Sequence, residues 1–113
     1  MERTEPSWAV TPQKIQEVVR RIVEAAHPLK VIVFGSQARG DANADSDLDL
    51  MVIEERVEKV WAESSRLRTA FRDVELSADV LVTSRSKFDY WRDTPGNVYY
   101  EAAHEGRVVY EAP

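Results

Sequence analysis

Apolar residues recur along the chain at two different spacings, which predict alternating helices and strands. From Pro12 to Ala26 they return every three or four positions, the period of an amphipathic helix. Thr11 before Pro12 is a typical helix start, because threonine caps free backbone N–H groups and proline suits the first helical turn. Pro28 ends the helix, since the residue before a proline disfavours helical backbone.

Short uninterrupted apolar runs predict buried strands. Residues 29–34 and 47–53 form two such runs, and residues 74–83 form a third. Between the second and third runs, a less regular apolar stripe predicts a helix over about residues 55–71. The aromatic residues at helical spacing are expected in the core: Trp61, Phe71, Phe88 and Trp91.

The C-terminal third predicts two more helices and a last strand. Ser84 caps a short helix that Pro95 ends, and Asn97 opens a helix that Gly106 closes. The sequence "RVVYE" then forms a short terminal strand. Helices and strands alternate throughout, so a single sheet covered by helices is the expected architecture.

Composition narrows the function classes. The 113 residues fit one globular domain, which we expect over residues 11–113 after a loose arm at 1–10 without the apolar stretch of a signal peptide. The chain has no cysteine, which excludes disulfides and thiolate metal sites and fits a cytoplasmic protein. The net charge of −5 argues against stable nucleic-acid binding. The apolar runs are too short to span a membrane.

Two aspartates stand where the strand over 47–53 begins. Side chains two positions apart on a strand point to the same face, so Asp47 and Asp49 project together while Leu48 faces the core. Adjacent carboxylates near a core repel each other, and a divalent cation removes that repulsion. Oxygen ligands without cysteine or histidine indicate magnesium or manganese. The alternative is a strand-entry acid at Asp47 and a solvated side chain at Asp49.

A third carboxylate is available on the strand predicted over 74–83. Asp79 shares one face of that strand with Glu75 and Ser77 if no bulge intervenes. Three carboxylates on neighbouring strands suit a two-metal site for in-line phosphoryl displacement. The alternative for Asp79 is an ion pair with an arginine.

A Gly-Ser pair follows the strand over 29–34 directly. A strand that ends in Gly35-Ser36 and turns into a short helix exposes backbone N–H groups and a hydroxyl, which favour a phosphate. Gly35 permits the tight turn and the close approach of a ligand. Ser36 could also cap a helix over 37–39, either as its only role or in addition to a phosphate contact. The P-loop and the dinucleotide fingerprint are both missing.

Together these pieces resemble a known signature. Gly35-Ser36, ten further residues and Asp47-Leu48-Asp49 resemble the GS-x10-DxD signature of the nucleotidyltransferase superfamily related to DNA polymerase β. The flanking "FGSQARGDANADSDLDLMV" resembles its minimal nucleotidyltransferase (MNT) family. The resemblance covers nearly the whole chain. It implies an α+β fold in which helices pack on a single mixed sheet.

The resemblance also implies roles for individual residues. Asp47 and Asp49 would bind two Mg²⁺ ions, for which Mn²⁺ is a substitute. Asp79 would complete one metal site and help activate the acceptor hydroxyl. Gly35 and Ser36 would hold the triphosphate of a nucleotide donor, with ATP expected. Arg39 matches the family pattern too, with a contact either to phosphate or to the Asp-rich loop.

The implied activity is transfer of AMP, or another nucleotide, to an acceptor hydroxyl. Because 113 residues leave no room for a second substrate domain, the acceptor is expected to be a protein or to be held by another chain. MNT proteins are commonly paired with a HEPN-domain protein, and by resemblance this chain would be an antitoxin that adenylylates such a toxin. Two alternatives remain: a non-catalytic antitoxin that masks its partner, and a small-molecule nucleotidyltransferase.

Overall fold

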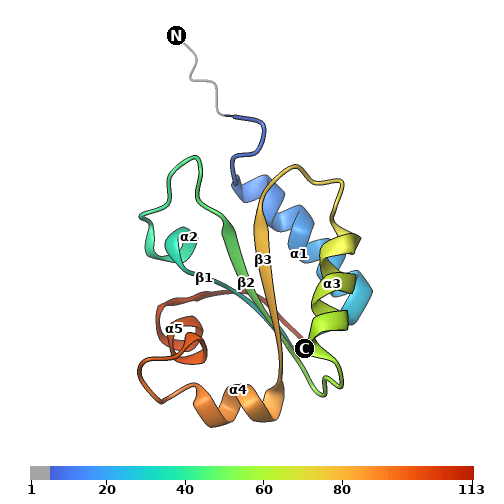
Figure 1. Ribbon diagram of the computed structural model, residues 1–113, viewed down its shortest axis with the longest axis vertical. Coiled ribbons are helices and arrows are strands. Elements are labelled where there is room, and N and C mark those ends of the chain that lie inside the picture. The colour runs from blue at the N-terminus through green and yellow to red at the C-terminus, as the bar shows by residue number, and fades with distance from the viewer. Residues whose placement is uncertain (1–5) are drawn as a thin grey trace.

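The computed structural model describes residues 6–113 (Figure 1). In chain order they form α1 (Pro12–Ala26), β1 (Lys30–Phe34), α2 (Ser36–Arg39), β2 (Leu48–Glu54), α3 (Val60–Ala70), β3 (Ala78–Ser84), α4 (Arg85–Trp91), α5 (Val98–Glu105) and β4 (Arg107–Glu111). Residues 1–5 of the predicted arm lie outside this range. In its remainder Ala9 is buried, and the Lys14 Nζ donates to the Ala9 carbonyl at 2.9 Å. No helix in 6–113 has the length and apolar character needed to cross a bilayer.

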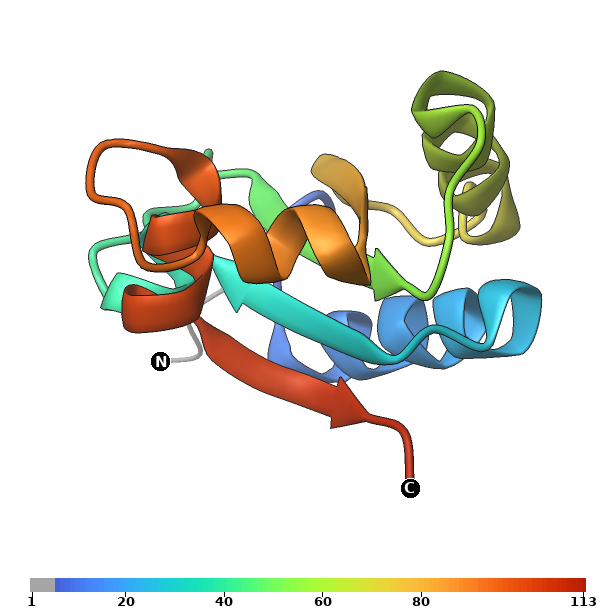
Figure 2. The same cartoon turned by 90° about the horizontal axis from the view of Figure 1, so that it is seen from below.

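The strands form one mixed sheet. Their order is β3-β2-β1-β4, with β1 antiparallel to both β2 and β4, and β2 parallel to β3. β4 runs along the outer edge of the sheet beside β1 (Figure 2). The predicted α+β architecture, a single mixed sheet with helices packed on it, is confirmed.

Alternating residues of β2 face two separate parts of the core. Leu48, Leu50 and Val52 pack with α1 and with the end of α3. Met51 and Ile53 point the other way, toward Phe88 of α4 and Ala102 of α5. Asp49 lies between Leu48 and Leu50, so its side chain is on the α4 and α5 side of the sheet. The predicted separation of Asp49 from the leucines is confirmed.

Side-chain caps begin three helices where the sequence predicts them. The Thr11 hydroxyl accepts a hydrogen bond from the Lys14 backbone N–H at 3.2 Å. The Ser84 hydroxyl accepts from Lys87 at 3.3 Å, and the Asn97 side-chain oxygen accepts from Tyr100 at 2.9 Å. Each cap satisfies a backbone donor that the helix itself leaves unpaired.

Two predicted boundaries are wrong. The third helix begins at Val60 rather than near residue 55, and the third strand begins at Ala78 rather than at 74. Residues 71–77 are turns instead, in which Val74 donates to the Phe71 carbonyl at 2.9 Å. Glu75 and Ser77 therefore precede β3 and do not share a strand face with Asp79.

The aromatic core prediction is half right. Phe71 and Phe88 are buried, but Trp61 is 85% exposed and Trp91 is 39% exposed. In α3 the buried side chain is Leu67, so the helix turns that face to the sheet and leaves Trp61 in solvent. Spacing alone identifies an apolar stripe without saying which way the helix turns it.

Gly106 closes α5, but not with a left-handed backbone. Its φ is −81°, which any residue adopts. Glycine is required there because a Cβ would lie 2.6 Å from the Ile32 Cγ2 and 3.0 Å from the Val33 carbonyl oxygen. The close packing of the α5–β4 junction on β1 explains this glycine.

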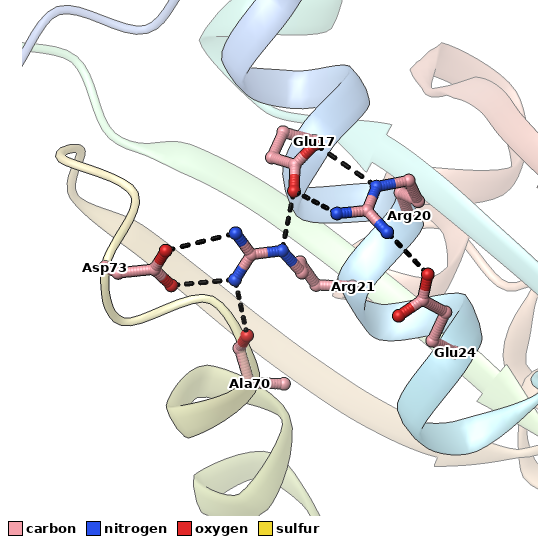
Figure 3. Close-up of polar contacts among 6 residues, drawn as sticks. All are labelled: Glu17, Arg20, Arg21, Glu24, Ala70 and Asp73. Carbon is pink, nitrogen blue, oxygen red and sulfur yellow. Dashed lines mark hydrogen bonds and ion pairs between the residues drawn. The ribbon is translucent and has the colours of Figure 1, made fainter.

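An ion-pair network ties α1 to the segment that leads into β3 (Figure 3). The Arg21 guanidinium donates to both carboxylate oxygens of Asp73, at 2.7 and 3.0 Å, and to the Ala70 carbonyl at 3.2 Å. Glu17 accepts from the Arg21 Nε at 2.6 Å. Such bidentate pairs fix geometry as well as charge. The network holds the turns from which β3 carries Asp79 toward β2.

Candidate active site

Two strand ends bring the three predicted aspartates together. Asp47 immediately precedes β2, Asp49 is its second residue, and Asp79 is the second residue of β3. Asp49 and Asp79 are partners in the parallel register, so their backbones lie about 4.8 Å apart, the spacing of neighbouring strands. Partner positions in a sheet project to the same face. The predicted convergence of these carboxylates therefore has a backbone basis.

The Gly35 turn lies directly against Asp49. Phe34, the last residue of β1, pairs with Asp49, and Gly35 follows with a φ of +72°. A Cβ at Gly35 would collide with the Asp49 Oδ2 and lie 3.3 Å from its Cγ. The glycine thus serves two needs, a backbone conformation that side chains disfavour and room for the Asp49 carboxylate. The second need was not predicted from the sequence.

Ser36 begins the short helix α2 rather than capping it. Gly35 occupies the cap position, and no side chain caps this helix. The alternative in which Ser36 is an N-cap for residues 37–39 is therefore wrong. The hydroxyl and the adjoining backbone N–H groups stand at the start of α2, beside the Asp49 carboxylate that abuts Gly35.

Arg39 is held between two acids. Its Nε donates to the Asp41 Oδ2 at 3.3 Å, and its Nη1 donates to the Glu101 Oε2 at 3.1 Å. Of the two contacts that the sequence left open, the contact with the Asp-rich loop is present through Asp41. Glu101 was not predicted, because it comes from α5 and no spacing signal links that helix to the Gly-Ser turn.

The surroundings of Asp49 are strongly negative. Burial raises the pKa of its carboxyl, and the nearby charges of Asp79, Asp47 and Glu101 raise it further. The Arg39 guanidinium lowers it by a smaller amount. Asp49 is therefore not a solvated side chain of ordinary acidity. Within residues 6–113 Asp79 has no ion pair with an arginine, so the alternative structural role for it is not supported.

The donor set suits a hard divalent cation. Carboxylate oxygens without cysteine or histidine are the ligands that magnesium and manganese prefer. As their side chains stand, no three acidic or histidine groups of the described residues form a closed metal site. Asp47 and Asp79 are exposed, so both can change rotamer toward Asp49. Asp47, Asp49 and Asp79 would hold a cation once their carboxylates converge.

A separate hollow of about 460 Å³ lies between α1 and β4. Its lining is Pro12, Gln13, Ile15, Gln16, Val19, Arg107 and Val109. It is lined by no carboxylate, so it offers neither the acidic ligands of a Mg²⁺ site nor a carboxylate general base. The chemistry of the described residues points to the aspartate end of β2.

Comparison with known proteins identifies the family of this chain. A family model described as a nucleotidyltransferase domain matches residues 13–105. The chain belongs to this nucleotidyltransferase domain family. The match includes Gly35-Ser36 and all three aspartates of the site. No curated protein matches the chain.

Solved structures share the fold of this nucleotidyltransferase domain. An inferred nucleotidyltransferase from Sulfolobus solfataricus aligns with a TM-score of 0.62 at 19% identity, covering 88% of this chain and 78% of that one. A toxin–antitoxin structure with AMP-PNP aligns with a TM-score of 0.51 at 16% identity, covering 91% and 75%. A mutant of the toxin–antitoxin pair MntA-HpeT aligns at 0.50 and 14%, with the same coverage. At these identities the likeness establishes the fold.

Proposed function

We propose that this nucleotidyltransferase transfers AMP from ATP, in a metal-dependent reaction, to a hydroxyl group of a protein partner. The observation that carries the proposal is the placement of Asp49 and Asp79 at partner positions of β2 and β3, with the Gly35 turn against Asp49. A triphosphate held at the Gly-Ser turn would lie next to the carboxylates that suit Mg²⁺. No other described cluster combines these two features.

The roles follow from position and charge. The Ser36 hydroxyl and the backbone N–H groups at the start of α2 bind the triphosphate. Asp47, Asp49 and Asp79 would hold the Mg²⁺ ions, which would neutralise phosphate oxygens. The acceptor hydroxyl attacks the α-phosphorus, the bond to the β-phosphate breaks, and pyrophosphate leaves. Asp79 helps to activate the acceptor hydroxyl by accepting its proton, since Asp79 lies on β3 and is exposed to an incoming acceptor.

The acceptor is expected on a HEPN-domain toxin, for which this chain would be the cytoplasmic MNT antitoxin. The sequence resemblance to MNT proteins supports this assignment, and toxin–antitoxin structures are among those with the same fold. One of those structures contains AMP-PNP, an ATP analogue. The net charge of −5 would steer a basic partner toward the domain.

The decisive experiment is a transfer assay. The chain is incubated with Mg²⁺, ATP labelled at the α-phosphate and any HEPN protein that co-purifies with it. We expect label on one or a few neighbouring hydroxyls of the partner and, after labelling, loss of the partner's toxicity. Label on a small molecule instead would favour the small-molecule nucleotidyltransferase. Absence of transfer would remove the enzymatic proposal.

The masking alternative needs its own control. The Asp47→Asn variant keeps the shape of the domain but lacks one metal-binding carboxylate. It should bind the partner without adding AMP, as mass spectrometry after co-expression would reveal. If an equimolar amount of this variant silences the partner fully, the antitoxin acts by masking and the catalytic account of its role is wrong.

A further inference from the structure

The guanidinium of Arg39 is already occupied by two carboxylates. Arg39 ends α2, the helix that begins at Ser36, so its side chain belongs to the same short segment as the proposed phosphate-binding turn. Asp41 is its local partner, two residues along the chain. Glu101 is its distant partner, in the first turn of α5. The ion pair Arg39–Glu101 is thus a bridge between α5 and the segment that holds the Gly35-Ser36 turn.

This bridge lies within electrostatic reach of the catalytic carboxylates. The negative charge of Glu101 raises the pKa of Asp49, and the positive charge of Arg39 lowers it. Asp49 in turn abuts the Gly35 turn. A triphosphate bound at the start of α2 would therefore bring its negative charge within one helical turn of Arg39, whose backbone N–H donates to the Gly35 carbonyl at 3.0 Å.

The Arg39–Glu101 ion pair forms in this structure, and it is weak enough for another anion to replace Glu101. The side chains of Arg39 and Glu101 are 41% and 34% exposed, and exposed ion pairs contribute little to stability. The Arg39 guanidinium donates a single hydrogen bond to Glu101, whereas it can donate two parallel hydrogen bonds to a phosphate. A polyphosphate beside this pair would therefore compete with Glu101 for the arginine.

We infer that Glu101 is a positioning residue that holds Arg39 in the nucleotide-free enzyme and competes with the triphosphate for its guanidinium. The inference rests on the proposed function and deepens it. Glu101 occupies Arg39 as a phosphate would, and it thereby sets the nucleotide affinity of the site. Its effect passes through Arg39 rather than through contact with the reacting atoms.

A double-mutant cycle tests the inference through binding alone. The Kd of AMP-PNP in the presence of Mg²⁺ is measured by calorimetry for the wild type, Glu101→Gln, Arg39→Gln and the double variant. We expect Glu101→Gln to lower the Kd about threefold to fivefold, the scale of an exposed ion pair. In the Arg39→Gln background the same change should alter the Kd less than about twofold, because only screened long-range repulsion remains.

Glu105→Gln is the matched control, since it removes the same charge one turn further along α5. It should change the Kd less than about twofold. In the transfer assay Glu101→Gln should lower the KM for ATP by the same factor as the Kd, with kcat unchanged. A residue that only supported the fold would not produce tighter binding that depends on Arg39.

The possible results separate the two proposals. If the wild type binds AMP-PNP but Glu101→Gln binds equally or more weakly, the inference is overturned and the proposed function stands. Equal tightening with and without Arg39 overturns it as well, because the effect would then be general repulsion. If the wild type binds no AMP-PNP with Mg²⁺, the proposed function and the inference fall together.

Discussion

Strand β2 carries an acidic side chain near each of its ends, and the surroundings of the two differ sharply. Asp49, near the start, lies among other carboxylates, beside the Gly35 turn and within reach of Arg39. Glu54, at the end, has a buried Oε2 with no hydrogen-bond partner among the described residues. Burial, and after it the neighbouring Glu63 carboxyl, raises the pKa of Glu54 from 4.5 to about 8. Glu54 therefore keeps its proton to a higher pH than an exposed glutamate does.

The difference shows that unfavourable negative charge is accommodated in two ways at the two ends of β2. Glu63 is already engaged by Arg66, whose Nε donates to it at 2.9 Å, so Glu54 is left to take up a proton. At the other end several carboxylates gather around Asp49, and among residues 6–113 Arg39 alone lowers its pKa. The Asp49 end of β2 gathers carboxylates without neutralising their charge, so it is suited to bind a cation. The comparison thus separates the partly buried carboxyl of Glu54 from Asp49, the carboxyl on the same strand that we propose as a metal ligand.

The largest expected effect is loss of transfer at the Asp49 end. Asp49→Asn should reduce nucleotide transfer at least about 100-fold, because the Mg²⁺ ions that would neutralise the phosphates lose a negatively charged ligand. In metal-free buffer the same variant should melt at an equal or slightly higher temperature, through relief of like-charge repulsion. Transfer assays and thermal melts measure both. If Mg²⁺ with ATP stabilises the variant as much as the wild type, the metal site is wrongly placed.

The turn against Asp49 gives the next effect. Gly35→Val should destabilise the domain by about 3 kcal/mol, since it adds backbone strain to a collision with the Asp49 carboxylate. Gly40→Ala is the control, because Gly40 has a φ of +86° but open space around its Cβ position. Urea unfolding should show the smaller loss for Gly40→Ala, and only Gly35→Val should also weaken nucleotide binding. Equal losses in stability and binding would mean that strain, not contact with Asp49, explains Gly35.

Ser36 gives a smaller effect confined to the nucleotide. Ser36→Ala should weaken ATP binding by about 1.5–3 kcal/mol, the contribution of a hydrogen bond to a charged group. Its thermal stability should stay close to that of the wild type, since the hydroxyl caps no helix. Calorimetric titration with Mg²⁺ and ATP is the measurement. Unchanged affinity would reduce the Gly-Ser segment to an ordinary strand–helix corner.

The smallest effect is at Glu54 and depends on pH. A carboxyl whose pKa is raised on folding weakens the folded state as pH rises from about 4.5 to about 8, because the unfolded chain releases its proton first. Glu54→Gln should therefore be more stable than the wild type at pH 8, by about 1 kcal/mol after screening by solvent, and equal at pH 4. Melts across this range test it, with the exposed Glu58→Gln as control. Transfer should be unaffected; a large loss would erase the contrast with Asp49.

Much of the fold was predictable because local signals agree with the tertiary structure. Thr11-Pro12, Ser84 and Asn97 each place a helix start correctly, since a cap depends only on residues within one turn. The buried face of α3 was not predictable in the same way. Trp61 fits a helical stripe, yet the packing of Leu67 on the sheet decides which face is buried. Tertiary contacts outweighed the local pattern there.

The candidate site likewise has one part that local sequence predicts and another that depends on tertiary contacts. Asp47, Asp49 and the Gly-Ser pair lie close together in the chain, so their spacing alone indicates a phosphate and metal site. Glu101 could not be found in this way, because its proximity to Arg39 depends on how α5 packs against β1. The raised pKa of Glu54 was equally hidden, since it depends on burial and on where α3 places Glu63.

The parallel pairing of β2 with β3 has a kinetic consequence. Asp49 and Asp79 become neighbours only after the chain has passed through α3 and returned, a long-range closure that is intrinsically slow in folding. During synthesis, the segment through β2 emerges with its acids but without their partner strand. Mg²⁺ and nucleotide would bind only after this closure, so they should lengthen the lifetime of the native state and leave the folding rate nearly unchanged.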